Sequence, residues 1–174
     1  MGADKAMVPL RGKPMLMHVL EQITPLFSNI VISTRELREN LPCQQIIDAS
    51  EDRGPMVGII TALEAVESDW LFVIACDMPF VSHALIRLLA TNRDAHDAVV
   101  SHVHGRVQPL FGFYAKTSLP MMKRQMQQGQ RSMIRLLDKL NSSIVSEQQV
   151  REIDPQFESL ISLDSIEDVK KWSV

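Results

Sequence analysis

The chain has 174 residues, of which 45% are hydrophobic and 22% charged, which is typical of one soluble globular domain over residues 1–174. A net charge of −3 and only 5% aromatic residues argue against a nucleic-acid-binding surface. No apolar run reaches about 18 residues and no cleavable leader is present, so we expect neither a membrane span nor secretion. Cys43 and Cys76 stand far apart, as two reduced thiols of a cytoplasmic protein would.

Apolar segments rich in β-forming residues alternate with helical patterns along the chain. In chain order, these patterns predict a helix over residues 15–26, strands over 29–33 and 45–48, a helix over 57–66, a strand over 70–75, a helix over 84–90 behind Ser82, strands over 98–103 and 110–114, and helices over 133–140 and 166–172 behind Ser132 and Ser165. The strand over 70–75 is apolar on both faces, as a central strand must be. This alternation predicts a doubly wound α/β sheet.

Polar clusters follow three of the predicted strands. They lie at residues 33–35, 48–58 and 76–79. Ligands of such sheets bind beyond the carboxyl ends of the strands, so we expect an active site where these clusters meet.

Asp77 ends the strongest strand, and Pro79 then takes the chain out of regular structure. A carboxylate in this place can hold a Mg²⁺ that bridges substrate phosphates, or it can simply cap the following turn. Lys5 precedes the constrained turn 11–14, and its compact ammonium group suits phosphate oxygens. The alternative for Lys5 is a solvent-exposed ion pair with the neighbouring acid.

Two glycine-containing segments open helices. Gly54 and Pro55 precede a helix whose free N–H groups can attract anions or ribose hydroxyls. In residues 129–132, Arg131 can grip a phosphate bidentately with Ser132 as the N-cap, or the segment is a tight turn with a solvent-exposed arginine.

Six motifs occur in one order: Met-Gly-Ala-Asp-Lys at 1–5, Gly-Lys-Pro-Met at 12–15, Gly-Pro-Met-Val-Gly at 54–58, Cys-Asp-Met-Pro at 76–79, Gln-Pro-Leu-Phe-Gly at 108–112 and Gly-Gln-Arg-Ser at 129–132. In this order they resemble the molybdenum cofactor guanylyltransferase family. The resemblance implies a Rossmann-like three-layer α/β/α fold with a mostly parallel sheet, of the nucleotide-diphospho-sugar transferase type. It also implies Mg²⁺-dependent transfer of GMP from GTP to the molybdopterin-bound molybdenum cofactor, with release of pyrophosphate.

The resemblance also implies roles for individual residues. Asp77 would hold Mg²⁺, and Lys5 would contact the GTP phosphates as a second catalytic group. The nucleotide side would further include Ser33, Asp48, Gly54 and Pro55, and the acceptor side would include Gln108, Pro109, Arg131 and Ser132. The alternatives are a cytidylyltransferase or sugar-phosphate nucleotidyltransferase of the same fold, or a non-catalytic homologue that binds the molybdopterin acceptor or a chaperone of a molybdoenzyme.

The sequence departs from this family pattern in three places. The family's Leu-Ala-Gly-Gly loop, whose backbone N–H groups would cradle the triphosphate, would precede Met1. We therefore expect the first strand and this loop to be missing, with translation from an upstream start codon as the simplest cause, and we expect unpaired edges on the two neighbouring strands. The family asparagine after the second strand corresponds to Ser33, and the Asn-Ile-Asn-Thr-Pro segment corresponds to residues 162–166.

Overall fold

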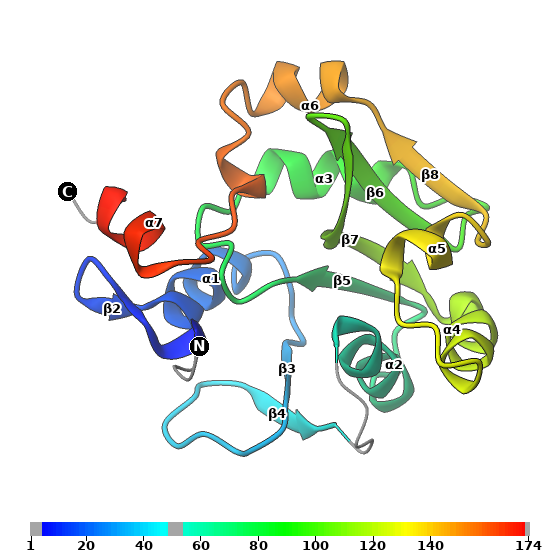
Figure 1. The fold of residues 1–174 in the computed structure, drawn as a ribbon, viewed down its shortest axis with the longest axis horizontal. Coiled ribbons are helices and arrows are strands. Elements are labelled where there is room, and N and C mark those ends of the chain that lie inside the picture. The colour runs from blue at the N-terminus through cyan, green and yellow to red at the C-terminus, as the bar shows by residue number, and fades with distance from the viewer. Residues whose placement is uncertain (1–4, 49–53, 173–174) are drawn as a thin grey trace.

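The computed structural model describes residues 5–48 and 54–172 (Figure 1). Its strands are β1 (Pro9–Leu10), β2 (Lys13–Pro14), β3 (Val31–Thr34), β4 (Gln44–Ile47), β5 (Trp70–Ile74), β6 (Ala98–Val103), β7 (Arg106–Ala115) and β8 (Ser142–Val145). Its α-helices are α1 (Met15–Ile23), α2 (Pro55–Ala65), α3 (His83–Thr91), α4 (Leu119–Gln127), α5 (Met133–Leu137), α6 (Glu147–Ile153) and α7 (Ile166–Lys171). Short 3₁₀ turns are η1 (Lys5–Met7), η2 (Lys116–Ser118) and η3 (Glu158–Leu160).

The strands form a four-stranded sheet in the order β5-β7-β6-β8, a parallel β3-β4 pair and a small β1-β2 hairpin. β8 runs parallel to β6, whereas β7 runs antiparallel to both β5 and β6. The predicted α/β class is confirmed, but the four-stranded sheet is mixed and not mostly parallel as expected. The sheet is mixed because β6 and β7 are joined by a tight hairpin, which forces antiparallel pairing.

Alternate residues of the central strands pack on opposite faces of the sheet. On β6, Val99 and Val103 belong to one core cluster with α3 and α6, while Ala98 and Val100 belong to another with α2, α4 and α5. The same period of two appears along β5 and β7, as strand geometry requires. The molecule therefore has helices on both faces of the sheet, which is the layered arrangement that the sequence predicted.

Helix α1 ties the β3-β4 pair to the larger sheet. Its apolar face packs against Ile32 of β3 and Ile74 of β5 in one cluster. Within the described part of the chain, β3 pairs only with β4, and β5 pairs only with β7. Among the described residues, β3 and β5 thus each have one edge without a partner strand.

Several boundaries differ from the sequence prediction. Helix α1 ends at Ile23, three residues before the predicted end, because Pro25 has no N–H to continue the hydrogen-bond ladder. Besides the short β1-β2 hairpin and the 3₁₀ turns, three elements were not predicted. α4 carries many polar residues, α6 has only seven residues, and β8 is a four-residue strand with two serines, so their periodic signals are weak. The serine N-caps at Ser82, Ser132 and Ser165 are confirmed.

Over residues 5–48 and 54–172, no helix is long and apolar enough to cross a membrane.

Candidate active site

Lys5 lies beside two carboxylates. Its Nζ is 2.8 Å from Asp164 Oδ1 and 3.8 Å from Asp77 Oδ2. The Asp77 side chain is only 15% exposed, whereas that of Asp164 is 69% exposed. The hydrogen bond to Asp164, followed by the charges of both aspartates, raises the pKa of the Lys5 ammonium above its ordinary value of 10.5. Lys5 is therefore a positive charge held between the carboxylates of Asp77 and Asp164.

The backbone around Asp77 explains how these three residues meet. Asp77 follows β5, and the N–H of Leu163 donates to the Asp77 carbonyl at 2.9 Å. This bond brings the segment that carries Asp164 alongside the end of β5. The sequence prediction placed Lys5 and Asp77 together but missed Asp164. Its only signal was its place in the segment 162–166, which departs from the family pattern.

A second group of site residues forms where β3 and β4 end. Ser33 Oγ donates to Asp48 Oδ1 at 2.5 Å, so these two predicted nucleotide-side residues are in direct contact. Gly58, in the second turn of α2, faces them. A Cβ built at this position would overlap Ser33 Oγ and would lie 3.8 Å from Asp48 Oδ1. Glycine is therefore what allows α2 to approach β3 this closely.

Gly54 and Pro55 begin α2. Gly54 has φ +119° and is the N-cap, and Pro55 occupies the first helical turn. The cap residue has no side chain to satisfy the first N–H groups of this eleven-residue helix. Residues 49–53 of the predicted 48–58 cluster lie outside the described residues.

Two of the residues predicted for the acceptor side, Gln108 and Pro109, lie on β7 near the end of β5. The N–H of Ala75 donates to the carbonyl of Leu110 at 3.1 Å, which places Pro109 next to the chain that leads to Asp77. The buried hydroxyl of Tyr114 donates to the Pro109 carbonyl at 2.7 Å. Burial strongly raises the pKa of this phenol, so it stays protonated as a donor.

Arg131 and Ser132 lie on the loop between α4 and α5. Ser132 caps α5 by accepting a hydrogen bond from the Arg135 N–H at 3.3 Å. Helix α4 packs against α2 on the side away from β4 (Figure 1). This loop is thus separated in the fold from the Ser33–Asp48 pair by the body of α2.

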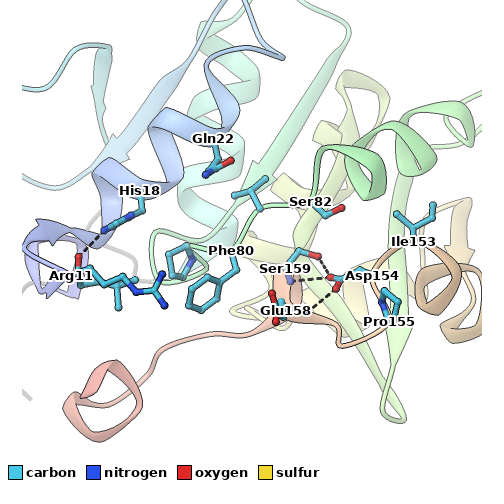
Figure 2. A pocket seen from close by; sticks show the side chains of 13 residues that line it. Arg11, His18, Gln22, Phe80, Ser82, Ile153, Asp154, Pro155, Glu158 and Ser159 are labelled. Carbon is cyan, nitrogen blue, oxygen red and sulfur yellow. Dashed lines mark hydrogen bonds between the residues drawn. The ribbon is translucent and has the colours of Figure 1, made fainter. Parts of the chain in front are cut away.

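A cavity of about 370 Å³ lies behind the loop that carries Asp77 (Figure 2). The residues that line it are Leu10, Arg11, His18, Gln22, Pro79, Phe80, Val81, Ser82, Ile153, Asp154, Pro155, Glu158 and Ser159. Asp154 is tied to Ser159 and to the N–H of Glu158 by hydrogen bonds, which fixes that wall. The predicted site residues do not line this cavity.

His102, on β6, and His104 lie at the β6-β7 hairpin. His104 has φ +51° in the β6-β7 turn, and its ring packs edge-on against Phe157. Among the residues that the structure describes, no group of three or more His, Cys, Asp or Glu side chains is arranged to hold a metal ion.

Known proteins resemble the whole of this chain. A family model for the MobA-like NTP transferase domain matches residues 1–144. The molybdenum cofactor guanylyltransferase of Syntrophotalea carbinolica is 30% identical over 176 residues, covering 99% of this chain and 84% of that protein. A probable molybdenum cofactor guanylyltransferase of Bacillus cereus is 31% identical over 158 residues, covering 86% of this chain and 79% of that protein.

Solved structures of nucleotidyltransferases also resemble this chain. The crystal structure of the molybdopterin-guanine dinucleotide biosynthesis protein A of Archaeoglobus fulgidus superimposes with a TM-score of 0.86 at 26% identity, covering 99% of this chain and 90% of that one. A 2-C-methyl-D-erythritol 4-phosphate cytidylyltransferase of Thermus thermophilus superimposes with a TM-score of 0.71 at 14% identity, covering 97% and 92%, and shares the fold. The chain is therefore a nucleotidyltransferase that belongs to the MobA-like NTP transferase family.

Proposed function

We propose that this protein transfers GMP from GTP to the terminal phosphate of the molybdopterin-bound molybdenum cofactor. In this reaction an oxygen of the acceptor phosphate attacks the α-phosphorus of GTP, the bond between that phosphorus and the α,β-bridging oxygen breaks, and pyrophosphate leaves. The observation that carries the proposal is the placement of Lys5 against Asp77 and Asp164 at the end of β5. The relatives named as guanylyltransferases supply the choice of nucleotide and acceptor.

The two carboxylates fit a Mg²⁺ ion. Mg²⁺ binds proteins through one or two carboxylates, keeps several waters and uses substrate phosphates as further ligands. Asp77 would be the principal ligand and Asp164 the second, since the Lys5 ammonium already contacts both. Bound there, Mg²⁺ would neutralise charge on the triphosphate and on the leaving pyrophosphate.

Lys5 supplies a second positive charge for the same phosphates. Its side chain is 39% exposed, so a phosphate oxygen can reach its ammonium in exchange for the Asp164 carboxylate. Because transfer of a nucleotidyl group depends on orientation and charge neutralisation, a cation fixed at the strand end suits the reaction.

On the nucleotide side, the Ser33–Asp48 pair places a hydroxyl and a carboxylate beside Gly58 of α2. A carboxylate accepts hydrogen bonds from ribose hydroxyls or from base N–H groups. The first turn of α2, which has no side-chain cap at Gly54, can bind the polar part of the same ligand through its N–H groups. Gln108, Pro109, Arg131 and Ser132 would meet the acceptor, with the Arg131 guanidinium on a phosphate.

The direct test is an assay of the purified chain with GTP, Mg²⁺ and molybdenum cofactor, in which the dinucleotide product and pyrophosphate are both measured. We expect GMP transfer with GTP, little transfer with CTP, and none after chelation of Mg²⁺. Preference for CTP would support a cytidylyltransferase instead. If calorimetry detects no GTP–Mg²⁺ binding while the acceptor still binds, the protein is a non-catalytic binding homologue.

We also propose a cytoplasmic location and contact with a molybdoenzyme chaperone, because a finished cofactor must pass to a client enzyme. Co-purification of the tagged protein from the cytoplasmic fraction, in the presence and absence of molybdate, tests both.

A further inference from the structure

Gln125 is a polar residue in an apolar environment. It lies on α4 and is 0% exposed, beside a core cluster that includes Met122, Met133 and Leu136. Its amide oxygen Oε1 is buried without a hydrogen-bond partner. An apolar side chain of similar size would fill this place without burying an unsatisfied oxygen, so packing alone does not explain glutamine here.

The hydrogen bonds of Gln125 hold both neighbours of Arg131. Its side-chain Nε2 donates to the Ser132 carbonyl at 2.9 Å. Its backbone carbonyl accepts from the Gln130 N–H at 3.0 Å. One residue therefore fixes the chain immediately before and immediately after Arg131.

Further hydrogen bonds in the loop support those of Gln125. Gly129, with φ +69°, turns the chain, and its N–H donates to the Met126 carbonyl at 2.8 Å. The Ser132 carbonyl that Gln125 holds also accepts from the Leu136 N–H at 3.1 Å, as the first bond of α5. The start of α5 and the direction in which Arg131 leaves the loop are thus set together.

We infer that Gln125 is a positioning residue that holds Arg131 in place for the acceptor phosphate. The inference rests on the proposed function for its substrate, because it takes Arg131 as an acceptor contact. The two hydrogen bonds by which Gln125 holds the loop do not depend on the proposed function. A fixed arginine loses less side-chain and loop freedom when it binds a phosphate, and affinity improves accordingly.

The first experiment probes the loop without any substrate. Trypsin cleaves after Arg131, and Gln125→Met keeps the volume while it removes the donor. We expect cleavage after Arg131 under native conditions to be about tenfold faster in Gln125→Met, the effect of losing one hydrogen bond. Cleavage after Arg87, in α3, is the internal control and should change less than twofold. Equal acceleration at both bonds would mean general destabilisation and would overturn the inference.

The second experiment measures the reaction. Gln125→Met should raise the KM for molybdenum cofactor about tenfold while kcat and the KM for GTP stay within about twofold. The matched control is Met122→Leu, which alters an equally buried side chain on the same helix and should leave both KM values unchanged. In the Arg131→Ala background the Gln125→Met change should have no further effect on acceptor KM, and additive effects would contradict the inference.

A third variant covers the case in which Gln125→Met does not fold. Gln130→Pro removes the N–H that donates to the Gln125 carbonyl, at a half-buried position outside the core. It should reproduce the selective cleavage after Arg131, and no change in cleavage would overturn the inference. If the wild-type chain transfers no GMP, the proposed function fails, whereas the cleavage ratios still decide whether Gln125 holds the loop.

Discussion

Lys5 and Asp164 form an ion pair of 2.8 Å although 159 positions separate them in the sequence. The pair closes the last loop of the fold onto its first turn, η1. The same closure is visible where Arg11 Nε donates to the Trp172 carbonyl at 3.0 Å, and α7 lies beside the N-terminal hairpin (Figure 1). The C-terminal segment thus supplies part of the candidate active site.

Asp164→Asn should weaken Mg²⁺ binding without abolishing activity. The amide oxygen keeps a weak ligand but loses the charge, so we expect the Mg²⁺ concentration for half-maximal activity to rise about tenfold, the effect of about 1.4 kcal/mol. Titration of initial rates with Mg²⁺ measures this. Asp69→Asn makes the same charge change at an exposed position before β5 and should leave the titration unchanged. An unchanged midpoint in Asp164→Asn would remove Asp164 from the metal site.

Asp77→Asn should abolish turnover. The carboxylate is largely buried, lies in the turn after β5 and would be the principal metal ligand. Loss of one preorganised electrostatic contact typically costs about 10²–10³-fold in kcat, and loss of the metal costs more. Single-turnover rates with saturating GTP and acceptor measure the effect, and circular dichroism confirms folding. Near-normal activity would show that the metal lies elsewhere.

The sequence predicted the parts of this site that depend on local pattern. β5 is an apolar run that ends at a carboxylate, and Ser82, Ser132 and Ser165 each cap the helix that follows. Such signals are visible because a strand end or a cap involves residues that are close in the chain.

The parts that it missed depend on contacts between distant segments. Asp164 reaches Lys5 only because Leu163 bonds to the Asp77 carbonyl, and no periodicity encodes that bond. Helix α4 was missed because its exposed face is polar and its buried Gln125 interrupts the apolar stripe. The mixed direction of the sheet follows from the β6-β7 hairpin, which the sequence analysis did not identify.

Gly58→Ala should destabilise the protein through Ser33. The new methyl group would overlap Ser33 Oγ, so α2 or β3 must shift, at a cost of about 1–3 kcal/mol. Chemical denaturation measures this loss. Because the obstacle is a side chain, adding Ser33→Gly to Gly58→Ala should recover much of the stability, while the KM for GTP stays raised by the loss of the Ser33–Asp48 contact.

Gly112→Ala is the matched control for this rescue. A Cβ at position 112 would lie 2.6 Å from the Val99 backbone carbonyl, which no substitution at residue 99 removes. We expect a comparable loss of stability with no recovery by side-chain changes on β6. If Ser33→Gly fails to rescue Gly58→Ala, the close approach of α2 to β3 is not the reason for glycine at position 58.

Tyr114→Phe should lower the free energy of unfolding by about 1–2 kcal/mol, because the half-buried Pro109 carbonyl loses its donor. If Pro109 contacts the acceptor as proposed, the variant should also raise the KM for the acceptor. Ser118→Ala removes another buried hydroxyl, which donates to the Ala115 carbonyl away from the site. Similar stability loss in both variants with a KM effect only in Tyr114→Phe is the expected result. Equal acceptor KM values in the two variants would mean that Pro109 has no part in acceptor binding.

Glu147 makes the stability of the β6-β7 hairpin depend on pH. The His104 N–H donates to Glu147 Oε2 at 2.8 Å and Arg151 Nη2 donates to Oε1 at 2.7 Å. These bonds, led by the His104 N–H, lower the pKa of the Glu147 carboxyl below its ordinary value of 4.5. A depressed folded-state pKa stabilises the native protein above the ordinary value, and this contribution is lost as pH falls through the folded pKa.

Glu147→Gln should therefore have a lower melting temperature than the wild type at pH 7, and this difference should shrink as the pH falls through the lowered pKa of the wild-type carboxyl. Calorimetric scans of both proteins across this range measure the effect. Glu152→Gln, on the same helix α6, controls for the change in net charge and should differ little from the wild type at either pH. A constant difference between Glu147→Gln and wild type at every pH would mean that Glu147 acts through the shape of its hydrogen bonds and not through its charge.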